Sequence, residues 1–323
     1  MIMAGEEYRH EVPFRHVYFT GIVRDKLGRK MSKQLGNSPD PIELLEKFGA
    51  DGVRMGMLLT APAGNDIPFD EAICEQGRNF SNKIWNALRL IKGWEMSASL
   101  QQSRDNEVAV QWMEMRMAQV LEEIEKDFDD FRLSEALMKS YKLVWDDFCS
   151  WYLEMIKPAY GEPIDKDTGI ATLGIMDRLM RILSPFMPFV TEEVWHEIQA
   201  SLNPEKAEML NANFSIMNQH MPHSVFYDER LLADFEQAKE IIAGVRNLRN
   251  SKGLPPKEQL ELYIKGTCPD TFHGIIRKLG NVTRIENVTE KVDGALSFLV
   301  GTTECFVPMS QNIDKEAELK KLA

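Results

Sequence analysis

A short basic segment near the start of the chain carries the side chains best suited to chemistry. From Arg24 to Lys33 five side chains are positive and one, Asp25, is negative, so the segment has a net charge of +4 within a chain of −12. The positive residues are Arg24, Lys26, Arg29, Lys30 and Lys33. Lysines three residues apart, beside a turn that contains Gly28, are suited to holding a polyphosphate whose charge changes during a reaction. Composition alone leaves a second interpretation open, an ordinary solvated basic turn.

The core of this segment resembles the signature loop of class I aminoacyl-tRNA synthetases. Lys30-Met31-Ser32-Lys33-Gln34 is similar to the Lys-Met-Ser-Lys-Ser signature, and the flanking Leu35-Gly36-Asn37 and residues 49–54 agree with it. Two longer blocks, residues 78–89 and 148–154, resemble the valyl-tRNA synthetase family rather than its isoleucyl or leucyl relatives. The resemblance extends over nearly the whole chain, which makes it far more specific than a lone five-residue motif.

This resemblance implies an enzyme that activates valine with ATP, releases pyrophosphate and transfers the valine to tRNA(Val). It implies that Lys30 and Lys33 are catalytic residues that hold the ATP phosphates, and that Met31 and Ser32 also bind ATP by shaping the loop. In the whole enzyme it implies ATP with Mg²⁺ as cofactors, valine and tRNA(Val) as partners, a cytoplasmic location and a monomer. No membrane partner is expected, and no cofactor is expected on the fragment itself.

The sequence departs from the family in two ways. Gln34 stands where the family usually has serine, and both lysines remain in place. The His-Ile-Gly-His motif and the editing domain are missing, so we expect a C-terminal fragment that is inactive alone. Two alternatives remain: a stand-alone tRNA-binding module, or a fragment of an isoleucyl or leucyl enzyme. A protein that only binds tRNA has no need of the adenylate loop, which disfavours the first.

Several amide, basic and aromatic side chains outside the loop are candidates for contacts with tRNA. One helix face carries hydrogen-bond donors at offsets of three and four residues, a spacing that can meet unstacked bases and phosphates. The candidates on this face are Asn79, Lys83, Asn86 and Arg89. On other helices the candidates are Trp151, Arg246 and Arg249. For the polar residues the alternative is a solvated face. For the aromatic cluster around Trp151 it is core packing, which we expect for Phe148 and Tyr152.

The elements that must position these residues are mostly helices. Apolar residues recur every three or four positions at Phe80, Ile84, Leu88 and Ile91, which predicts a buried helical stripe. Similar stripes predict further helices, one stopping at Lys157-Pro158 and another beginning at Thr191. The predicted fold is mainly α: an anticodon-binding helical bundle, preceded by an α/β remnant of a Rossmann catalytic domain and followed by a small α+β unit.

The predicted domains follow from these patterns and from the resemblance. Residues 1–75 would end the catalytic domain, with one strand at His16–Gly21. Residues 76–224 would form the anticodon-binding bundle and 225–312 the α+β unit. The latter would hold a long helix from Glu229 to Lys252, strands near 260–264, 282–288, 296–300 and 304–307, and a short helix at 271–279. Residues 313–323 would start a truncated coiled-coil helix.

Composition excludes several classes of protein. The negative net charge excludes binding of nucleic acid by uniform positive charge, so local patches must do so. Four scattered cysteines favour neither a disulfide framework nor a cysteine zinc site, and Cys149 is expected to be a buried thiol. His220 and His223 lack a third ligand nearby, so no metal site is predicted. No apolar run approaches the ~20 residues of a membrane span.

Overall fold

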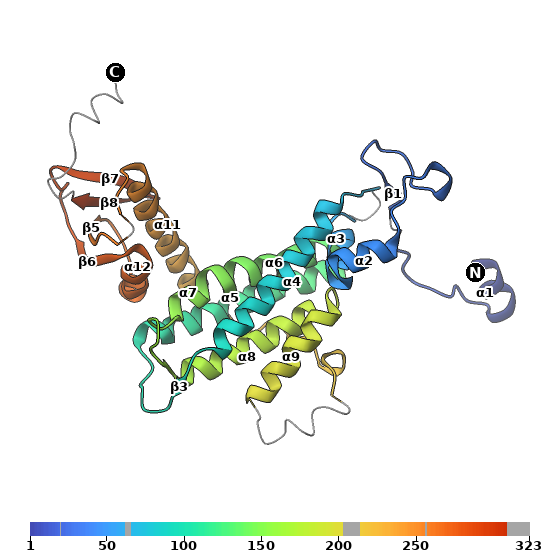
Figure 1. Cartoon of the computed structure of the whole chain (residues 1–323), viewed down its shortest axis with the longest axis horizontal. Coiled ribbons are helices and arrows are strands. Elements are labelled where there is room, and N and C mark those ends of the chain that lie inside the picture. Colours follow the sequence, from blue (N-terminus) through green and yellow to red (C-terminus); the bar gives the residue numbers. More distant parts are fainter. Residues whose placement is uncertain (20, 62–65, 203–213, 256, 309–323) are drawn as a thin grey trace. The chain divides into compact units, whose positions relative to one another are not determined.

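The computed structural model describes residues 1–19, 21–61, 66–202, 214–255 and 257–308. Contacts divide the chain into two compact units. The first comprises residues 1–93, 119–146 and 173–224, and the second comprises 94–118, 147–172 and 225 onward. Helices predominate in the described ranges (Figure 1), so the mainly α class is confirmed. The predicted helix after residue 313 lies outside the described residues.

A small α/β segment carries the basic loop. Strand β1 (Val23–Arg24) pairs in parallel with β2 (Ile67–Pro68), and helices α2 (Pro41–Phe48) and α3 (Ala50–Leu59) lie between them in sequence. Parallel strands need a long crossover of this kind, because the chain must return to the same end of the sheet. The basic loop leaves β1 directly. A separate helix, α1 (Ile2–Arg9), precedes this segment.

The strand predicted at His16–Gly21 does not form. The described residues of this stretch have no strand pairing, and the side chains of Val17 and Phe19 are 57% and 75% exposed. A strand is stable only where a neighbour satisfies its backbone groups, and apolar alternation alone does not supply that neighbour. Pairing begins instead at Val23, where β2 provides the partner.

Helix α4 (Glu71–Lys92) confirms the predicted stripe, and its side chains Phe80, Ile84, Leu88 and Ile91 are all buried. The Asp70 carboxylate caps the helix by accepting from the Ala72 N–H at 3.1 Å. Helix α3 packs closely on α4 through glycines. A Cβ added to Gly77 would lie 2.5 Å from the Gly52 oxygen, so Gly77 has no room for a side chain, and a Cβ at Gly52 would lie 3.1 Å from the backbone of Cys74 and Arg78.

The other helices of the bundle follow the predicted order. They are α5 (Arg104–Asp129), α6 (Leu133–Lys142), the π-helix η2 (Leu143–Tyr152), α7 (Leu153–Ile156), α8 (Lys166–Leu183) and α9 (Pro188–Leu202). Helix α7 ends before Pro158, as predicted. Phe148, Cys149 and Tyr152 are buried, which confirms their assignment to the core. A short parallel pair, β3 (Met96–Ser97) and β4 (Ile164–Asp165), and the 3-10 turn η4 (Ile216–Asn218) complete this part.

Helix α9 begins at Pro188, three residues before the start predicted at Thr191. Proline is tolerated in a first helical turn because its missing N–H would have no partner there. The Thr191 hydroxyl therefore lies inside the helix and donates to the Met187 carbonyl at 2.8 Å.

The predicted α+β unit is confirmed. Helix α11 (Glu229–Ser251) precedes a sheet of order β6-β5-β8-β7, and α12 (His273–Gly280) connects β5 to its parallel neighbour β6. The strands are β5 (Leu260–Lys265), β6 (Val282–Asn287), β7 (Ala295–Val300) and β8 (Thr303–Pro308), and the turn η5 (Asp270–Phe272) precedes α12. Figure 1 shows α11 and α12 beside this sheet.

Candidate functional site

The basic loop begins as a tight hairpin. The Gly28 N–H donates to the Asp25 carbonyl at 2.9 Å, and Gly28 has φ of +75°, a value that glycine adopts without strain. The chain then returns beside β1, where Arg24 and Lys30 form an antiparallel bridge and the Met31 N–H donates to the Val23 carbonyl at 3.2 Å. The signature residues therefore leave a well-defined turn.

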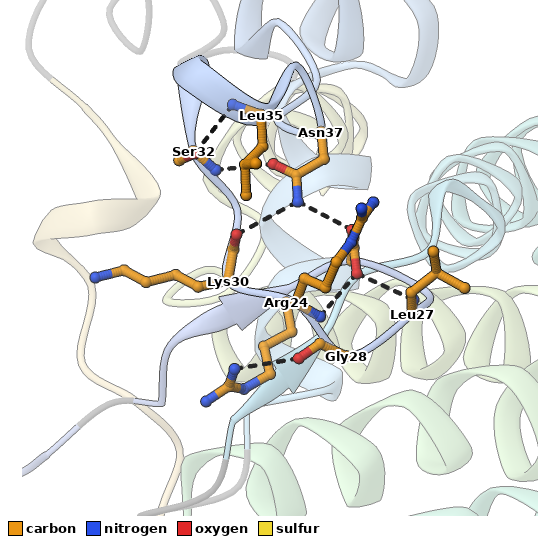
Figure 2. A network of polar contacts seen from close by, with 9 residues as sticks. Arg24, Leu27, Gly28, Lys30, Ser32, Leu35 and Asn37 are labelled. Atoms are coloured by element: carbon orange, nitrogen blue, oxygen red, sulfur yellow. Dashed lines mark hydrogen bonds and ion pairs between the residues drawn. The ribbon is translucent and has the colours of Figure 1, made fainter.

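Asn37 holds the signature segment against this hairpin. Its amide oxygen accepts from the Ser32 N–H at 2.9 Å, and its amide nitrogen donates to the Asp25 carboxylate at 2.9 Å and to the Lys30 carbonyl at 3.3 Å. Figure 2 shows Asn37 at the centre of these contacts, with the Lys30 ammonium directed away from them. One side chain thus fixes both ends of the loop.

Ser32 organises the second half of the signature. Its hydroxyl accepts from the Leu35 N–H at 3.2 Å and so caps the 3-10 helix η1 (Lys33–Leu35), which ends at Gly36. Lys33 is the first residue of this turn, and its side chain is exposed. The side chain of Gln34, at the position that departs from the family, is also exposed and does not displace either lysine.

Three of the five cations in the loop are neutralised by carboxylates. Arg24 pairs with Asp66, the Lys26 ammonium lies 3.1 Å from Asp70, and Arg29 lies 2.8 Å from Asp25. Among the described residues, no carboxylate pairs with the other two. These two are Lys30 and Lys33, the lysines of the signature, and both are exposed. The uncompensated positive charge of the loop is therefore concentrated on the residues that the sequence singled out.

The three carboxylates are held in their charged form. The Asn37 amide is the largest cause that lowers the pKa of Asp25, and the Arg24 guanidinium is the largest cause that lowers that of Asp66. The Ala72 N–H, followed by Lys26, lowers the pKa of Asp70. Because their pKa values are lowered, the three carboxylates are negatively charged at neutral pH and can pair with the cations of the loop.

Removing the Asn37 amide should raise the pKa of Asp25. In Asn37→Ala we expect it to move up toward the ordinary value of 3.8. Because the native pKa is depressed, the ionised carboxylate stabilises the loop above pH 3.8, and this contribution is lost as pH falls through the depressed value. In the variant this contribution should be smaller, and its loss on acidification should be complete at a higher pH. An NMR titration of the Asp25 carboxyl carbon measures this. Asn79→Ala on α4 is the control, and an Asp25 pKa equal in both variants would contradict the role of Asn37.

A pocket of about 460 Å³ lies beside the loop, but its lining does not suit phosphate. Asp25, Asp70 and Glu71 contribute to its walls, and neither Lys30 nor Lys33 does. Among the described residues, no cluster of three or more His, Cys, Asp or Glu side chains could hold a metal ion. Within the same ranges, no helix has the length and apolar character of a membrane span.

The candidate tRNA residues on α4 remain largely accessible. Asn79, Asn86 and Arg89 are exposed. Lys83 is half-buried, with its ammonium 5.2 Å from the centre of the Trp145 ring. A cation held over an aromatic face is less free to reach a phosphate. Arg89 is therefore the most accessible cation of this face, which we call the α4 polar face (Asn79, Lys83, Asn86 and Arg89).

Trp151 and Arg246 lie together in the second unit. The Trp151 ring is half-buried and contacts Phe235 edge-on, with 5.9 Å between ring centres. The Arg246 guanidinium lies 5.9 Å from the same ring and also donates to the Leu279 carbonyl at 3.0 Å. Both side chains already have partners within this unit, so their predicted contact with tRNA would compete with existing contacts.

Arg249, a candidate for contact with tRNA in the sequence, is not on the surface. The residue is 6% exposed, and its guanidinium donates to four carbonyls, those of Pro255, Glu258, Gly280 and Asn281, at 2.6 to 3.3 Å. A buried cation needs such partners, because losing its hydration without them is costly. Arg249 therefore joins α11 to the segment that precedes β5 and to the end of α12, and we withdraw it from the tRNA-binding set.

Sequence reasoning missed the residues that organise the loop. Asn37, Asp66 and Asp70 had no assigned role, although Asn37 stands within the segment that resembles the family. The available signal was chemical: an amide beside a basic turn can satisfy loose backbone groups. Nothing in the local spacing indicated that Asp66 and Asp70 would meet cations about 40 residues earlier.

Two family models match the chain. One, described as the anticodon-binding domain of tRNA ligase, matches residues 110–264. The other, described as tRNA synthetases class I (I, L, M and V), matches residues 1–70 and so includes the basic loop. Helix α4 lies between the two matched ranges.

Curated relatives match along the whole chain. Valine–tRNA ligases from Parabacteroides distasonis and Phocaeicola vulgatus are each 54% identical over 100% of the chain, and that from Fusobacterium nucleatum is 31% identical. The chain spans 36% of the length of the first two relatives. A solved ternary complex of Agrobacterium radiobacter K84 LeuRS, tRNA and LeuAMS aligns with 72% of this chain and 26% of its own, at 21% identity and a TM-score of 0.48.

Proposed function

The chain belongs to the valine–tRNA ligase family of class I tRNA synthetases, and we propose that it supplies two working parts of such an enzyme. The first part is a loop that holds the phosphates of ATP. The second is a helical surface that binds tRNA(Val). In the whole enzyme, the proposed activity is the ligation of valine to this tRNA at the expense of ATP.

In the proposed reaction, the valine carboxylate attacks the α-phosphorus of ATP. The bond to the bridging oxygen of the β-phosphate breaks, and pyrophosphate leaves with the bonding electrons. A hydroxyl of the terminal tRNA ribose then attacks the carbonyl carbon, and AMP leaves. Negative charge grows on the departing pyrophosphate, so fixed positive charges near it stabilise the transition state more than the ground state.

The observation that carries this proposal is the selective neutralisation of the loop. Carboxylates form ion pairs with Arg24, Lys26 and Arg29. Among the described residues, Lys30 and Lys33 have no such partner. Lys33 would hold the phosphates as charge moves onto pyrophosphate, and Lys30 would add a second positive charge. Met31 and Ser32 would shape the loop through their backbone and hydroxyl contacts.

The cofactor and the cellular setting are also proposals. Mg²⁺ is usually held by substrate phosphates and one or two carboxylates, so we propose that it accompanies ATP. ATP, valine and tRNA(Val) are the proposed ligands of the whole enzyme, which we propose to be a cytoplasmic monomer. The test is valine-dependent exchange of pyrophosphate into ATP by a complete ligase that contains this chain. Exchange driven by isoleucine or leucine in place of valine would overturn the proposal.

The α4 polar face is the part of the tRNA-binding surface that can be tested most directly. Arg89→Ala should weaken binding of tRNA(Val) and make the slope of log affinity against log salt shallower by ~1 unit, because one phosphate contact is lost. Filter binding at several salt concentrations measures both quantities. Lys92→Ala is the matched control, since Lys92 lies on the same helix and pairs with Glu197. If the two variants bind tRNA equally well, Arg89 has no role in the interface.

A further inference from the structure

Asp51 makes a contact that the proposed chemistry does not explain. It lies in the first turn of α3, is only 6% exposed, and its carboxylate accepts from the N–H groups of Phe189 and Val190 at 3.3 and 2.6 Å. These donors belong to the first turn of α9, 138 and 139 residues further along the chain. Asp51 therefore caps a helix distant from its own in sequence.

Arg54 grips the same region one turn later. Its Nε donates to the Phe186 carbonyl and its Nη2 to the Pro185 carbonyl, each at 3.2 Å. These carbonyls lie in the bend between α8 and α9. On one side of the bend, Asp51 accepts hydrogen bonds from backbone N–H groups. On the other side, Arg54 donates hydrogen bonds to backbone carbonyls. Helix α3 therefore binds the bend between α8 and α9 through both kinds of backbone group.

Two further contacts fix α3 against the bundle. The Ser134 hydroxyl, at the start of α6, lies 2.7 Å from the Leu58 carbonyl and 2.8 Å from that of Ala61. On another side, Gly52 and Gly77 allow the backbones of α3 and α4 to touch. Helix α3 is thus held by α4, α6 and α9, and only the short α2 separates it from the signature loop.

The position of Asp51 carries a cost. Burial raises its pKa, because a low-dielectric environment disfavours the charged carboxylate, and this outweighs the lowering effect of Val190, Phe189 and Arg54. A neutral side chain would avoid this penalty. The carboxylate nevertheless has a structural effect. It accepts hydrogen bonds from two N–H groups at the N-terminus of α9 and so fixes the angle between α3 and α9.

We propose that Asp51 and Arg54 form a positioning latch, which fixes the orientation of the α2–α3 segment and its ATP loop relative to helix α9. This rests on the proposed function for its catalytic consequence. The tRNA held by the bundle must present its terminal ribose to an adenylate made near the loop. The latch then governs the transfer step, in which both parts must be aligned, and not adenylate formation, which does not involve tRNA. Asp51 and Arg54 are positioning residues, not catalytic ones.

The geometric part can be tested on the chain itself. Spin labels at Glu43 on α2 and Glu193 on α9, both exposed, would report this orientation through their distance distribution in a Cys268→Ser background. Asp51→Asn should broaden the distribution at least ~2-fold. Asp228→Asn is the matched control, because Asp228 also caps two N–H groups but within its own helix, α11. Equal widths in the two variants would overturn the latch. If Asp51→Asn does not fold, Arg54→Gln is judged by the same criterion.

The catalytic part uses a complete ligase. Asp51→Asn should lower kcat for aminoacylation ~10-fold, since small misalignments of reacting groups are costly, and should change tRNA-independent pyrophosphate exchange less than ~2-fold. A merely structural role would lower Tm and leave this ratio unchanged, which would contradict the proposal. Absence of valine-dependent exchange in the unsubstituted enzyme would instead remove the proposed function, and the spin-label distances would still decide the latch.

Discussion

Replacing Lys33 by alanine in a complete ligase that contains this chain should slow valine-dependent pyrophosphate exchange by ~10²- to 10³-fold. The ammonium of Lys33 is exposed at the start of η1 and has no carboxylate partner among the described residues. Its charge is therefore available to the departing pyrophosphate, and its loss acts on the transition state. Binding of tRNA should be nearly unchanged, because the loop is not part of the proposed tRNA surface.

Lys26→Ala is the matched control for this experiment. Lys26 lies in the same loop and carries the same charge, but its ammonium is paired with Asp70 at 3.1 Å. Its removal should cost less than ~10-fold, since an ammonium already held by a carboxylate is less available to phosphate, and Asp70 keeps the Ala72 N–H as a partner. The assignment fails if the Lys33 variant retains the exchange rate of the unsubstituted enzyme, or if both variants lose the same factor.

Replacing Phe80 by alanine should destabilise the chain by ~3 to 5 kcal/mol, a large part of the ~5 to 15 kcal/mol that an ordinary domain has. Phe80 is fully buried, packs edge-on against Tyr141 with 4.8 Å between ring centres, and lies near Trp145. Truncation removes these contacts and leaves a cavity that helices can close only in part. Urea unfolding followed by circular dichroism measures the change.

Trp85→Ala provides the comparison, because Trp85 lies on the same helix and is 40% exposed. Its larger ring has less burial to lose, so the cost should stay below that of Phe80. Equal losses of unfolding free energy in the two variants would contradict the assignment of Phe80 to the core and of Trp85 to the surface of α4.

Much of the helical fold could be predicted from the sequence. The stripe from Phe80 to Ile91 and the helix stop before Pro158 depend on residues three or four positions apart and on the geometry of proline. The predicted start of α9 was three residues too late, because Asp51, which is remote in sequence, caps that helix. The strand predicted at His16–Gly21 was wrong, since a strand depends on a partner that local alternation does not specify.

The candidate site divides in the same way. The sequence by itself determined which residues form the loop, because Lys30-Met31-Ser32-Lys33 is a contiguous motif whose spacing sets the placement of both lysines. Only the tertiary structure decided which charges remain available. Asp66 neutralises Arg24 from 42 residues away, and the four carbonyls around Arg249 turn a predicted surface cation into a buried structural one. Ion pairs and burial depend on distances between segments remote in sequence, and packing sets those distances.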